Sequence, residues 1–528
     1  MGNLQSSSEP RARLHSAQCA VSTLLAVLLA SAVLLSLLGH KLLTDWDEGI
    51  YAEIAREMQG RSWLVPQWNF QPWFEKPPLM FWITASFFKL FGVNEFWARA
   101  GSALSGVAIV GLLHGWLVRR GDRLAAWLST LLLLTTFGFL HVARVGEVDV
   151  LLSLGCVAAV RGLADVADHR GQGWYWFWGG LAAALMTKST ASITVALTGI
   201  LVVAVGRWGR SYFRTEFWLG VAGFLAAVVP WHLAIWHQFW LGVAGFLAAV
   251  VPWHLAIWHR FGNAFVSAYL GFHTLTRATE QIEGHITHWW FYLWVILVSA
   301  SPWVLLFPGA IAQAFKRVEL RPWAIFALVE IVFFSIVQTR LPHYIAPAYP
   351  ALALVSAVYW ADWLRQFAGR HPWTPQGFWL RVGLVAMAAW GIGALLTATP
   401  RKHLHSEWVN GRITHEEKES LVLLRDAFRT PQPEGPVLVW RESQPRSIAT
   451  ALFYTHRPVQ QVQLQPLPAD AVRDKYDFNP TMLDAAVMEQ PRVILLEKSL
   501  VSRIPPGMEY TPIARGMQVE LGTIRRAR

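Results

Sequence analysis

The sequence predicts a polytopic α-helical membrane protein with a small C-terminal α/β domain. Of its 528 residues, 54% are hydrophobic and 15% are charged, and 30 are tryptophan. This composition is typical of integral membrane proteins and excludes an ordinary soluble enzyme. Apolar runs of about twenty residues, the length that crosses a bilayer, recur as far as residue 398, and the composition then becomes polar. We therefore expect a transmembrane domain over residues 1–399 and a soluble domain over residues 400–528.

The apolar runs place the predicted spans. The first run is too long for a signal-peptide core and no small-residue cleavage site follows it, so we expect a retained span. The shorter run Pro78–Val93 begins with two prolines, which favours a helix lying at the membrane interface. The spans, about 11–13 in number, are expected near residues 19–40, 98–118, 123–141, 148–167, 174–187, 190–206, 217–236, 239–258, 290–310, 323–338, 342–364 and 378–398.

Orientation follows from the basic short loops. Lysine and arginine gather at residues 119–123, 207–214, 316–321 and 365–370, and such loops face the cytoplasm. The N-terminus is then cytoplasmic, while the loop 44–78 and the C-terminal domain face the opposite, periplasmic side. These loops explain the net charge of +11, so nucleic acid is not an expected partner.

One segment is present twice. FWLGVAGFLAAVVPWHLAIWH occurs at Phe217–His237 and again, letter for letter, at Phe239–His259. An identical copy indicates a recent tandem duplication or an artefact of the sequence record. If both copies crossed the membrane, every later loop would oppose the positive-inside pattern. We expect one copy to span and the other to be accommodated irregularly, and an inactive paralogue is one reading of the duplication.

The C-terminal part has the pattern of an α/β domain. Short β-like stretches occur at Pro436–Trp440, Val459–Leu464 and Arg492–Leu496, and a helical pattern at His415–Phe428. No catalytic motif is found in it. Across the chain, no Walker loop, Rossmann glycine pattern, GxSxG or HExxH occurs, so nucleotide use is not expected. The two cysteines, Cys19 and Cys156, lie in apolar runs and indicate neither a disulfide nor thiol chemistry.

The loop 44–78 is the strongest candidate for chemistry. Acidic residues are scarce, yet five lie between Asp45 and Glu57. Carboxylates at the exit of a span indicate either a catalytic site or a solvated acidic loop. Lys76 precedes two prolines, which hold the preceding chain extended. A lysine there can pair with a phosphate as a point charge or extend along the interface towards water.

Four short motifs of this loop resemble those of a known family: Asp47-Glu48, Tyr51–Met58, Trp63–Pro66 and Phe74–Leu79. In this order they resemble the first periplasmic loop of the polyprenyl-phosphate-sugar-dependent membrane glycosyltransferases of the GT-C superfamily. The sequence is most similar to the lipid A aminoarabinose transferase (ArnT-like) branch, and the protein O-mannosyltransferases are more distant relatives. The resemblance implies a bacterial inner-membrane enzyme that transfers a sugar from undecaprenyl phosphate with inversion of configuration at the anomeric carbon. Lipid A phosphate is the expected acceptor, and another periplasmic glycan or a protein hydroxyl is the alternative.

The resemblance also implies roles for single residues. Asp47, with its neighbour Glu48, is the expected catalytic carboxylate of the loop. It removes a proton if the acceptor is a hydroxyl, and it positions the sugar or stabilises positive charge at the anomeric carbon if the acceptor is a phosphate. Asp149 is the second expected catalytic aspartate, although a helix-capping role is open and Glu147 competes with it. The residues expected to bind the donor are Tyr51, Lys76, Arg277, Arg340 and Tyr344.

No cofactor is assigned, and a divalent metal is left open. In the aminoarabinose branch, a glutamate and a distant histidine are linked to metal, and they correspond to Glu75 and His285. His288 lies three residues further on, and the pattern does not separate the two histidines. Two histidines and a glutamate are a weak metal signal. Lys188 lies where relatives have a Thr-Lys-Gly-Pro word whose Gly-Pro is missing here, so its role also stays open.

A transporter or lipid flippase is the alternative from another class. Transporters keep their functional charges within the spans, whereas the candidate charges of this chain gather at predicted loop ends. This difference favours the glycosyltransferase.

Overall fold

The computed structural model of the chain divides into two compact units, each described here by itself. The first unit consists of Met1–Leu38, Lys76–Met80 and Ala100–Lys402, and the second of Gly39–Glu75, Phe81–Arg99 and His403–Arg528. The structure describes residues 8–44, 47–60, 63–73, 76–188, 191–209, 214–228, 288–337, 340–370, 415–441, 450–464 and 481–527.

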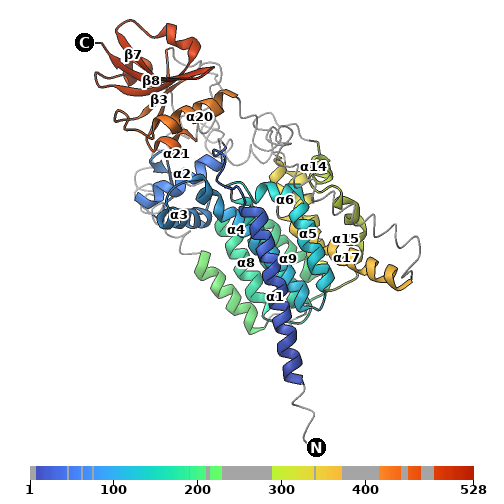
Figure 1. Cartoon of the computed structure of the whole chain (residues 1–528). Helices are drawn as coiled ribbons and strands as arrows, with labels where there is room; N and C mark the ends of the chain where they lie inside the picture. The colour runs from blue at the N-terminus through green and yellow to red at the C-terminus, as the bar shows by residue number, and fades with distance from the viewer. Residues whose placement is uncertain are drawn as a thin grey trace, which may run out of the picture. The chain divides into compact units, whose positions relative to one another are not determined.

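The first unit is a bundle of apolar helices (Figure 1). Within it, α17 packs against α5, α15 and α16, while α16 also packs against α7 and α9. Its elements are α1 (Ser8–Leu35), α4 (Glu95–Arg119, which begins in the second unit), α5 (Arg123–Thr135), α6 (Phe137–Val142), α7 (Asp149–Ala167), α8 (Gly173–Thr187), α9 (Ile193–Gly206), a helix over Thr215–Val228, α14 (Phe291–Ser299), η3 (Trp303–Leu306), α15 (Phe307–Ala314), α16 (Arg321–Ile336), η4 (Pro342–Ile345) and α17 (Ala348–Arg370).

These helices lie where the apolar runs predict helices, but many are shorter than a span. Among the described residues, three helices are long and apolar enough to cross a membrane: Ser16–Leu35, Glu95–Arg119 and Asp149–Ala167. The predicted span 123–141 is broken because Thr136 is extended. The predicted span 290–310 bends by 114° between Phe291–Ser299 and Trp303–Ala314, and this pair would make a fourth span if it crosses as one.

The number of spans and their orientation stay predictions. The predicted span 378–398 and the second copy of the repeat lie outside the described residues. Only the beginning of the first copy is described, as part of the helix Thr215–Val228. The predicted interfacial segment Pro78–Val93 does form a helix, α3 (Leu79–Phe91).

Helices α7 and α8 pack backbone against backbone. A Cβ atom added at Gly155 would lie 2.7 Å from the backbone nitrogen of Ala184, and one at Gly180 would overlap the backbone of Ala159. Small residues let helices in a membrane approach this closely, because no side chain separates the backbones. Gly179 differs, since an added Cβ there would meet no atom within 4 Å. The approach of these two helices therefore depends on Gly155 and Gly180 but not on Gly179.

The second unit is built on a six-stranded mixed sheet of order β5-β4-β3-β6-β8-β7. Strands β5, β4, β3 and β6 are parallel to one another, while β8 is antiparallel to both β6 and β7. The elements of the unit are α2 (Asp47–Gly60), β1 (Gln67–Trp68), β2 (Gln71–Pro72), α3, α20 (His415–Ala427), β3 (Val437–Trp440), α21 (Ala451–Thr455), β4 (Val459–Gln463), β5 (Thr481–Met482), α22 (Leu483–Ala486), β6 (Arg492–Glu497), η5 (Lys498–Arg503), β7 (Met508–Arg515) and β8 (Val519–Arg526).

Both faces of the central strand β3 are covered, which explains why it is apolar at every position. Val437 and Val439 of β3 pack with α20 and α21 on one face, while Leu438 and Trp440 pack with α22 and η5 on the other. The predicted helix and three β-like stretches of the C-terminal part are confirmed as α20, β3, β4 and β6. Strands β7 and β8 were not predicted. Most of β7 is exposed and lacks an apolar face.

Glu419 of α20 fixes the turn between β7 and β8. Its carboxylate accepts hydrogen bonds from the backbone N–H groups of Gln518, Val519 and Met517. Burial raises the pKa of Glu419, but these three bonds and the charge of Lys498 outweigh it, so the pKa lies below its ordinary value. The ionised carboxylate therefore stabilises the folded sheet.

We predict that neighbouring glycines of α8 respond oppositely to enlargement. Gly180→Leu forces α7 and α8 apart and should lower the free energy of unfolding by about 1–3 kcal/mol or more. Gly179→Leu places the same side chain in open space and should change stability little. The unfolding temperatures of both variants, measured in the same detergent, check this. Equal losses would contradict the backbone contact described for Gly180.

We predict a pH-dependent contribution from Glu419. Because its folded-state pKa is depressed, its stabilisation is present above the unfolded pKa and is lost as the pH falls through the folded value. Glu419→Gln should therefore lower the unfolding temperature at neutral pH, and the gap to the wild type should close on acidification. Glu509→Gln on β7 is the control, since Glu509 forms a half-exposed ion pair with Arg525, and such pairs contribute little. A gap that stays constant with pH would refute the role of the carboxylate charge.

Candidate functional site

A buried ion pair joins the start of α7 to the end of α8. Asp149 is the first residue of α7, and Lys188 directly follows the last residue of α8. The Lys188 Nζ atom donates to Asp149 Oδ1 at 2.8 Å, and the two side chains are 16% and 4% exposed. The N-terminus of a helix favours a negative charge. The backbone contact between α7 and α8 therefore holds a paired carboxylate and ammonium at one end of the bundle.

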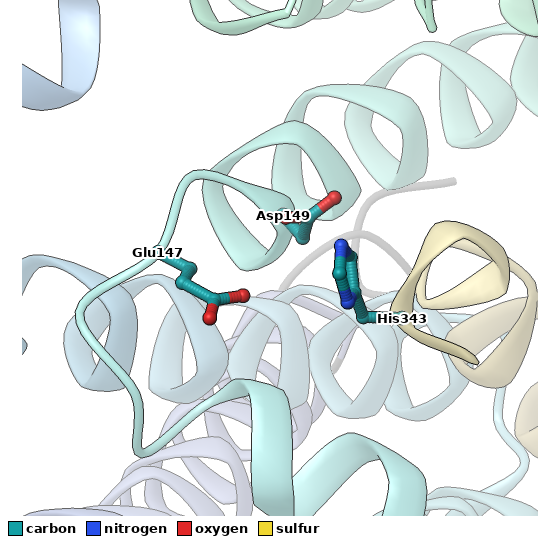
Figure 2. A group of neighbouring side chains, drawn as sticks. All are labelled: Glu147, Asp149 and His343. Atoms are coloured by element: carbon teal, nitrogen blue, oxygen red, sulfur yellow. The ribbon is translucent and has the colours of Figure 1, made fainter. Parts of the chain in front are cut away.

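Other chemically active side chains surround this pair. Glu147, on the loop before α7, and His343, from η4, offer ligand atoms that lie within 4.8 Å of one another and of Asp149 (Figure 2). Lys188 Nζ also lies 4.7 Å from the centre of the Tyr344 ring, which attracts a cation. We call Glu147, Asp149, Lys188, His343 and Tyr344 the Asp149 cluster. The charge of Lys76 also acts on Asp149, so the cluster joins carboxylates with cations.

The positive charges at the cluster disfavour a bound metal. Two carboxylates and an imidazole are a donor set that divalent ions accept. However, the Lys188 ammonium already pairs with Asp149, and Lys76 adds positive charge. A divalent ion among these groups would face two lysine cations at close range. The predicted ligands Glu75 and His285 lie outside the described residues.

Arg340 offers further hydrogen-bond donors near η4. Its Nη2 atom donates to the carbonyl of Ser335 at 2.6 Å, and the residue is 9% exposed. Its Nε and Nη1 atoms are buried and have no partner among the described residues. A buried donor without an acceptor costs free energy, so these two N–H groups are suited to an anionic ligand.

Behind the cluster lies a glutamate that the sequence analysis missed. Glu330 of α16 is 1% exposed, and its Oε1 atom lies 2.6 Å from the hydroxyl of Thr194. The same hydroxyl lies 2.9 Å from the carbonyl of Ala191. Because a hydroxyl has one hydrogen, Thr194 donates to only one of them. When it donates to Ala191, Glu330 must be protonated and donate in turn. A single acid in an apolar run is the signal that could have identified Glu330.

In the second unit, α2 carries the acidic residues of the loop 44–78. Both oxygens of Glu48 pair with Arg99, at 2.7 and 2.9 Å, and the pair is buried. Glu48 Oε2 also accepts from the backbone N–H of Thr44 at 2.6 Å. The geometry therefore favours a positioning role for Glu48, which anchors the first turn of α2 and with it the half-buried Asp47. The Tyr51 ring is buried against Trp73 and Phe81.

Further along α2, the remaining glutamates also have structural partners. Glu57 accepts from the backbone N–H of Phe70 at 2.8 Å. Glu53 Oε1 lies 3.2 Å from Nδ1 of His456, which follows α21. Burial raises the pKa of Glu53, although the hydrogen bond from His456 and the charge of Arg56 oppose this. Much of the acidic pattern that marks this loop is thus used to fix α2 in place.

The structure brings some of the predicted site residues close together. Asp149 and Tyr344 belong to one cluster, Lys76 acts on it, and Arg340 lies two residues before η4. Asp47, Glu48 and Tyr51 lie together on α2 in the other unit. Arg277 and His285 lie outside the described residues, as does Glu75. His343 and Glu330 were missed, and the role of Lys188 had been left open. The catalytic and binding roles of all these residues stay predictions.

Comparison with known proteins supports the resemblance. Residues 75–236 match the family described as dolichyl-phosphate-mannose-protein mannosyltransferase. An undecaprenyl phosphate-alpha-4-amino-4-deoxy-L-arabinose arabinosyl transferase of Enterobacter sp. (strain 638) is 29% identical over 354 residues, covering 63% of this chain and 58% of the relative. A similarly named transferase 2 of Proteus mirabilis (strain HI4320) is 27% identical over 397 residues, covering 70% of this chain and 66% of the relative. The chain thus matches less than two thirds of the length of either relative.

Solved structures extend the likeness over the whole chain. The crystal structure of ArnT from Cupriavidus metallidurans bound to undecaprenyl phosphate superposes with a TM-score of 0.68, at 22% identity, over 95% of this chain and 97% of that one. The apo form gives the same TM-score. At this identity the comparison establishes the fold. The chain therefore has a GT-C fold like that of ArnT and resembles, in sequence, the undecaprenyl phosphate-aminoarabinose arabinosyl transferases, as the loop 44–78 predicts.

Proposed function

We propose that this chain is a membrane glycosyltransferase that moves a sugar from undecaprenyl phosphate to a periplasmic acceptor. Lipid A phosphate is the acceptor we favour, and aminoarabinose, from the names of the relatives, is the sugar. The enzyme would lie in the bacterial inner membrane, with its N-terminus in the cytoplasm and its active site and C-terminal domain in the periplasm. The buried pair of Asp149 and Lys188 within the Asp149 cluster is the observation that carries this proposal.

The cations of the site suit the donor phosphate. In the transfer, the bond from the anomeric carbon to the phosphate oxygen breaks, and the phosphate leaves with the electron pair. Positive groups fixed beforehand in a water-poor site stabilise that charge. Lys188, Lys76 and the two N–H groups of Arg340 that have no partner among the described residues would provide them. The Tyr344 ring restricts where the Lys188 ammonium can lie.

Asp149 would act on the sugar. Positive charge develops at the anomeric carbon of such a transition state, and an ionised carboxylate nearby lowers its energy. The Lys188 ammonium keeps Asp149 ionised despite its burial. The acceptor oxygen attacks as the phosphate leaves, so the configuration is inverted. A phosphate acceptor is already anionic and needs no base, whereas a hydroxyl acceptor would give its proton to Asp47.

A lipid transporter is the second candidate, because one observation favours it. Glu330 is a buried acid in the middle of α16 with a hydroxyl partner, and transporters place ionisable groups in this way. Transfer to a protein hydroxyl or to another glycan remains the alternative within the enzyme class. The experiments below separate these possibilities.

We predict that the ion pair is required for transfer. Lys188→Met removes the positive charge but also leaves Asp149 buried and unpaired, which should cost about 3–5 kcal/mol of stability. Asp149→Asn with Lys188→Met removes both charges and should fold better than the single variant. The single variant and the double variant should each lower the rate of sugar transfer from undecaprenyl phosphate by about 100-fold or more. The control is Lys89→Met, an exposed lysine near the end of α3. A double variant that folds and keeps the wild-type rate would refute the assignment.

We predict that the product is found on lipid A. Mass spectrometry of lipid A from cells with and without the gene should show a gene-dependent increment whose size identifies the sugar. Cells that express Asp47→Asn at equal abundance should lack that increment. No increment in lipid A, together with a change in glycan or glycoprotein profiles, would move the proposal to the alternative acceptors. Full transfer by the Asp47→Asn variant would contradict the role of Asp47, and no transfer to any acceptor would favour the transporter or an inactive paralogue.

A further inference from the structure

An apolar groove lies between α7 and α8 and extends from Leu151, two residues after Asp149, to Trp176 near the start of α8. It has a volume of about 290 Å³. Its floor is formed where the two helix backbones meet at Gly155 and Gly180. Its walls are formed by Leu151, Leu154, Ala158, Tyr175, Trp176 and Ala183. Among the lining residues, only Tyr175 and Trp176 carry polar side-chain atoms, and both lie at the start of α8. The groove is therefore apolar along its length and polar at one end.

The groove is open because Gly179 has no side chain. Gly179 lines it, and an added Cβ there would meet no atom within 4 Å. This glycine is therefore not needed for helix packing, unlike Gly155 and Gly180. On α7, nearly every residue is buried, and the partly exposed ones include Leu154, Ala158 and Arg161. These three follow at intervals of four and three residues, so they form one stripe along the helix. That stripe leads from the groove to an arginine.

Arginines gather at the polar end. The Arg161 guanidinium lies 3.8 Å from the centre of the Trp176 ring. Asp165 pairs with Arg161 at 3.5 Å and with Arg120 at 3.0 Å. Asp168 pairs with Arg120 and with Arg170, and the charge of Arg119 also acts on Arg161. These residues comprise four arginines and two aspartates, and the carboxylate of Glu216 lies beside Gly171, so four positive charges meet three negative ones and positive charge is in excess.

We propose that the groove binds one acyl chain of an anionic phospholipid whose phosphate lies against Arg161. An acyl chain fits an apolar groove of this kind, and tyrosine and tryptophan are typical of the headgroup level of a membrane. Basic pockets between transmembrane helices bind anionic headgroups. The excess charge at the Arg161 end supplies the complementary partner. At the opposite end the lining residues Leu151 and Ala183 are apolar, and the Lys188 ammonium beyond them is already paired with Asp149, so the headgroup belongs at the Arg161 end.

The site has a structural consequence for the Asp149 cluster. Helix α7 begins at Asp149 and α8 ends next to Lys188. A lipid that fills the groove between them packs against both helices along the outer side of their contact. It would therefore stabilise the arrangement on which the ion pair depends. This inference requires only that the first unit lies in a membrane, and it does not rest on the proposed transfer reaction.

The test uses the full-length protein, delipidated in detergent and examined by native mass spectrometry with added phosphatidylglycerol or phosphatidylethanolamine. The wild type should bind one phosphatidylglycerol in preference to phosphatidylethanolamine. Gly179→Leu fills the groove and should weaken that binding about tenfold, which corresponds to about 1.4 kcal/mol. The control is Gly223→Leu, at another exposed helical glycine where an added Cβ meets no atom within 4 Å, and it should bind as the wild type does.

Two further measurements sharpen the test. Arg161→Gln should remove the preference for phosphatidylglycerol over phosphatidylethanolamine while leaving the groove open. Competition with undecaprenyl phosphate identifies the source of the phosphate, and we expect it not to displace phosphatidylglycerol. Unchanged binding by Gly179→Leu, or equal binding of the two phospholipids by the wild type, would overturn the proposal. Displacement by undecaprenyl phosphate would overturn it too, since the groove would then belong to the polyprenyl lipid.

Discussion

The first unit depends on one close contact, the backbone approach of α7 and α8. Gly155 and Gly180 permit it, because any side chain there would strike the facing helix. The contact sets Asp149 beside Lys188. A buried carboxylate without a partner would be strongly unfavourable, and so would a buried ammonium. The two charges therefore require the helices to stay in register, and the helices in turn fix the charges.

The acidic residues of α2 show how one pattern can serve two purposes. In sequence they form a cluster that suggests chemistry. In the folded second unit, Glu48 pairs with Arg99, Glu57 accepts from the backbone of Phe70, and Glu53 meets His456. These contacts hold the helix that begins at Asp47. A catalytic carboxylate needs a fixed position as much as it needs its charge, so structural neighbours are consistent with a functional Asp47.

The likeness of fold to ArnT covers nearly the whole chain, while two features of the sequence depart from the pattern expected of the family. The sequence identity to that structure is low. The missing Gly-Pro after Lys188 does not prevent this lysine from reaching Asp149. The repeated segment at 217–259 is the larger departure, and most of it lies outside the described residues.

The sequence by itself predicted an apolar helical protein with a C-terminal strand-containing domain, and the approximate positions of most of the described helices. Composition and apolar runs are enough for this, because burial in a membrane acts on whole segments. The motifs of the loop 44–78 and their order in the sequence determined the family resemblance. Only the tertiary structure could decide which charges meet. Asp149, Lys188 and His343 come from three distant segments, and Glu330 meets Thr194 across two helices. Local patterns carry no information about such long-range pairs, since the pairing is set by how the helices pack.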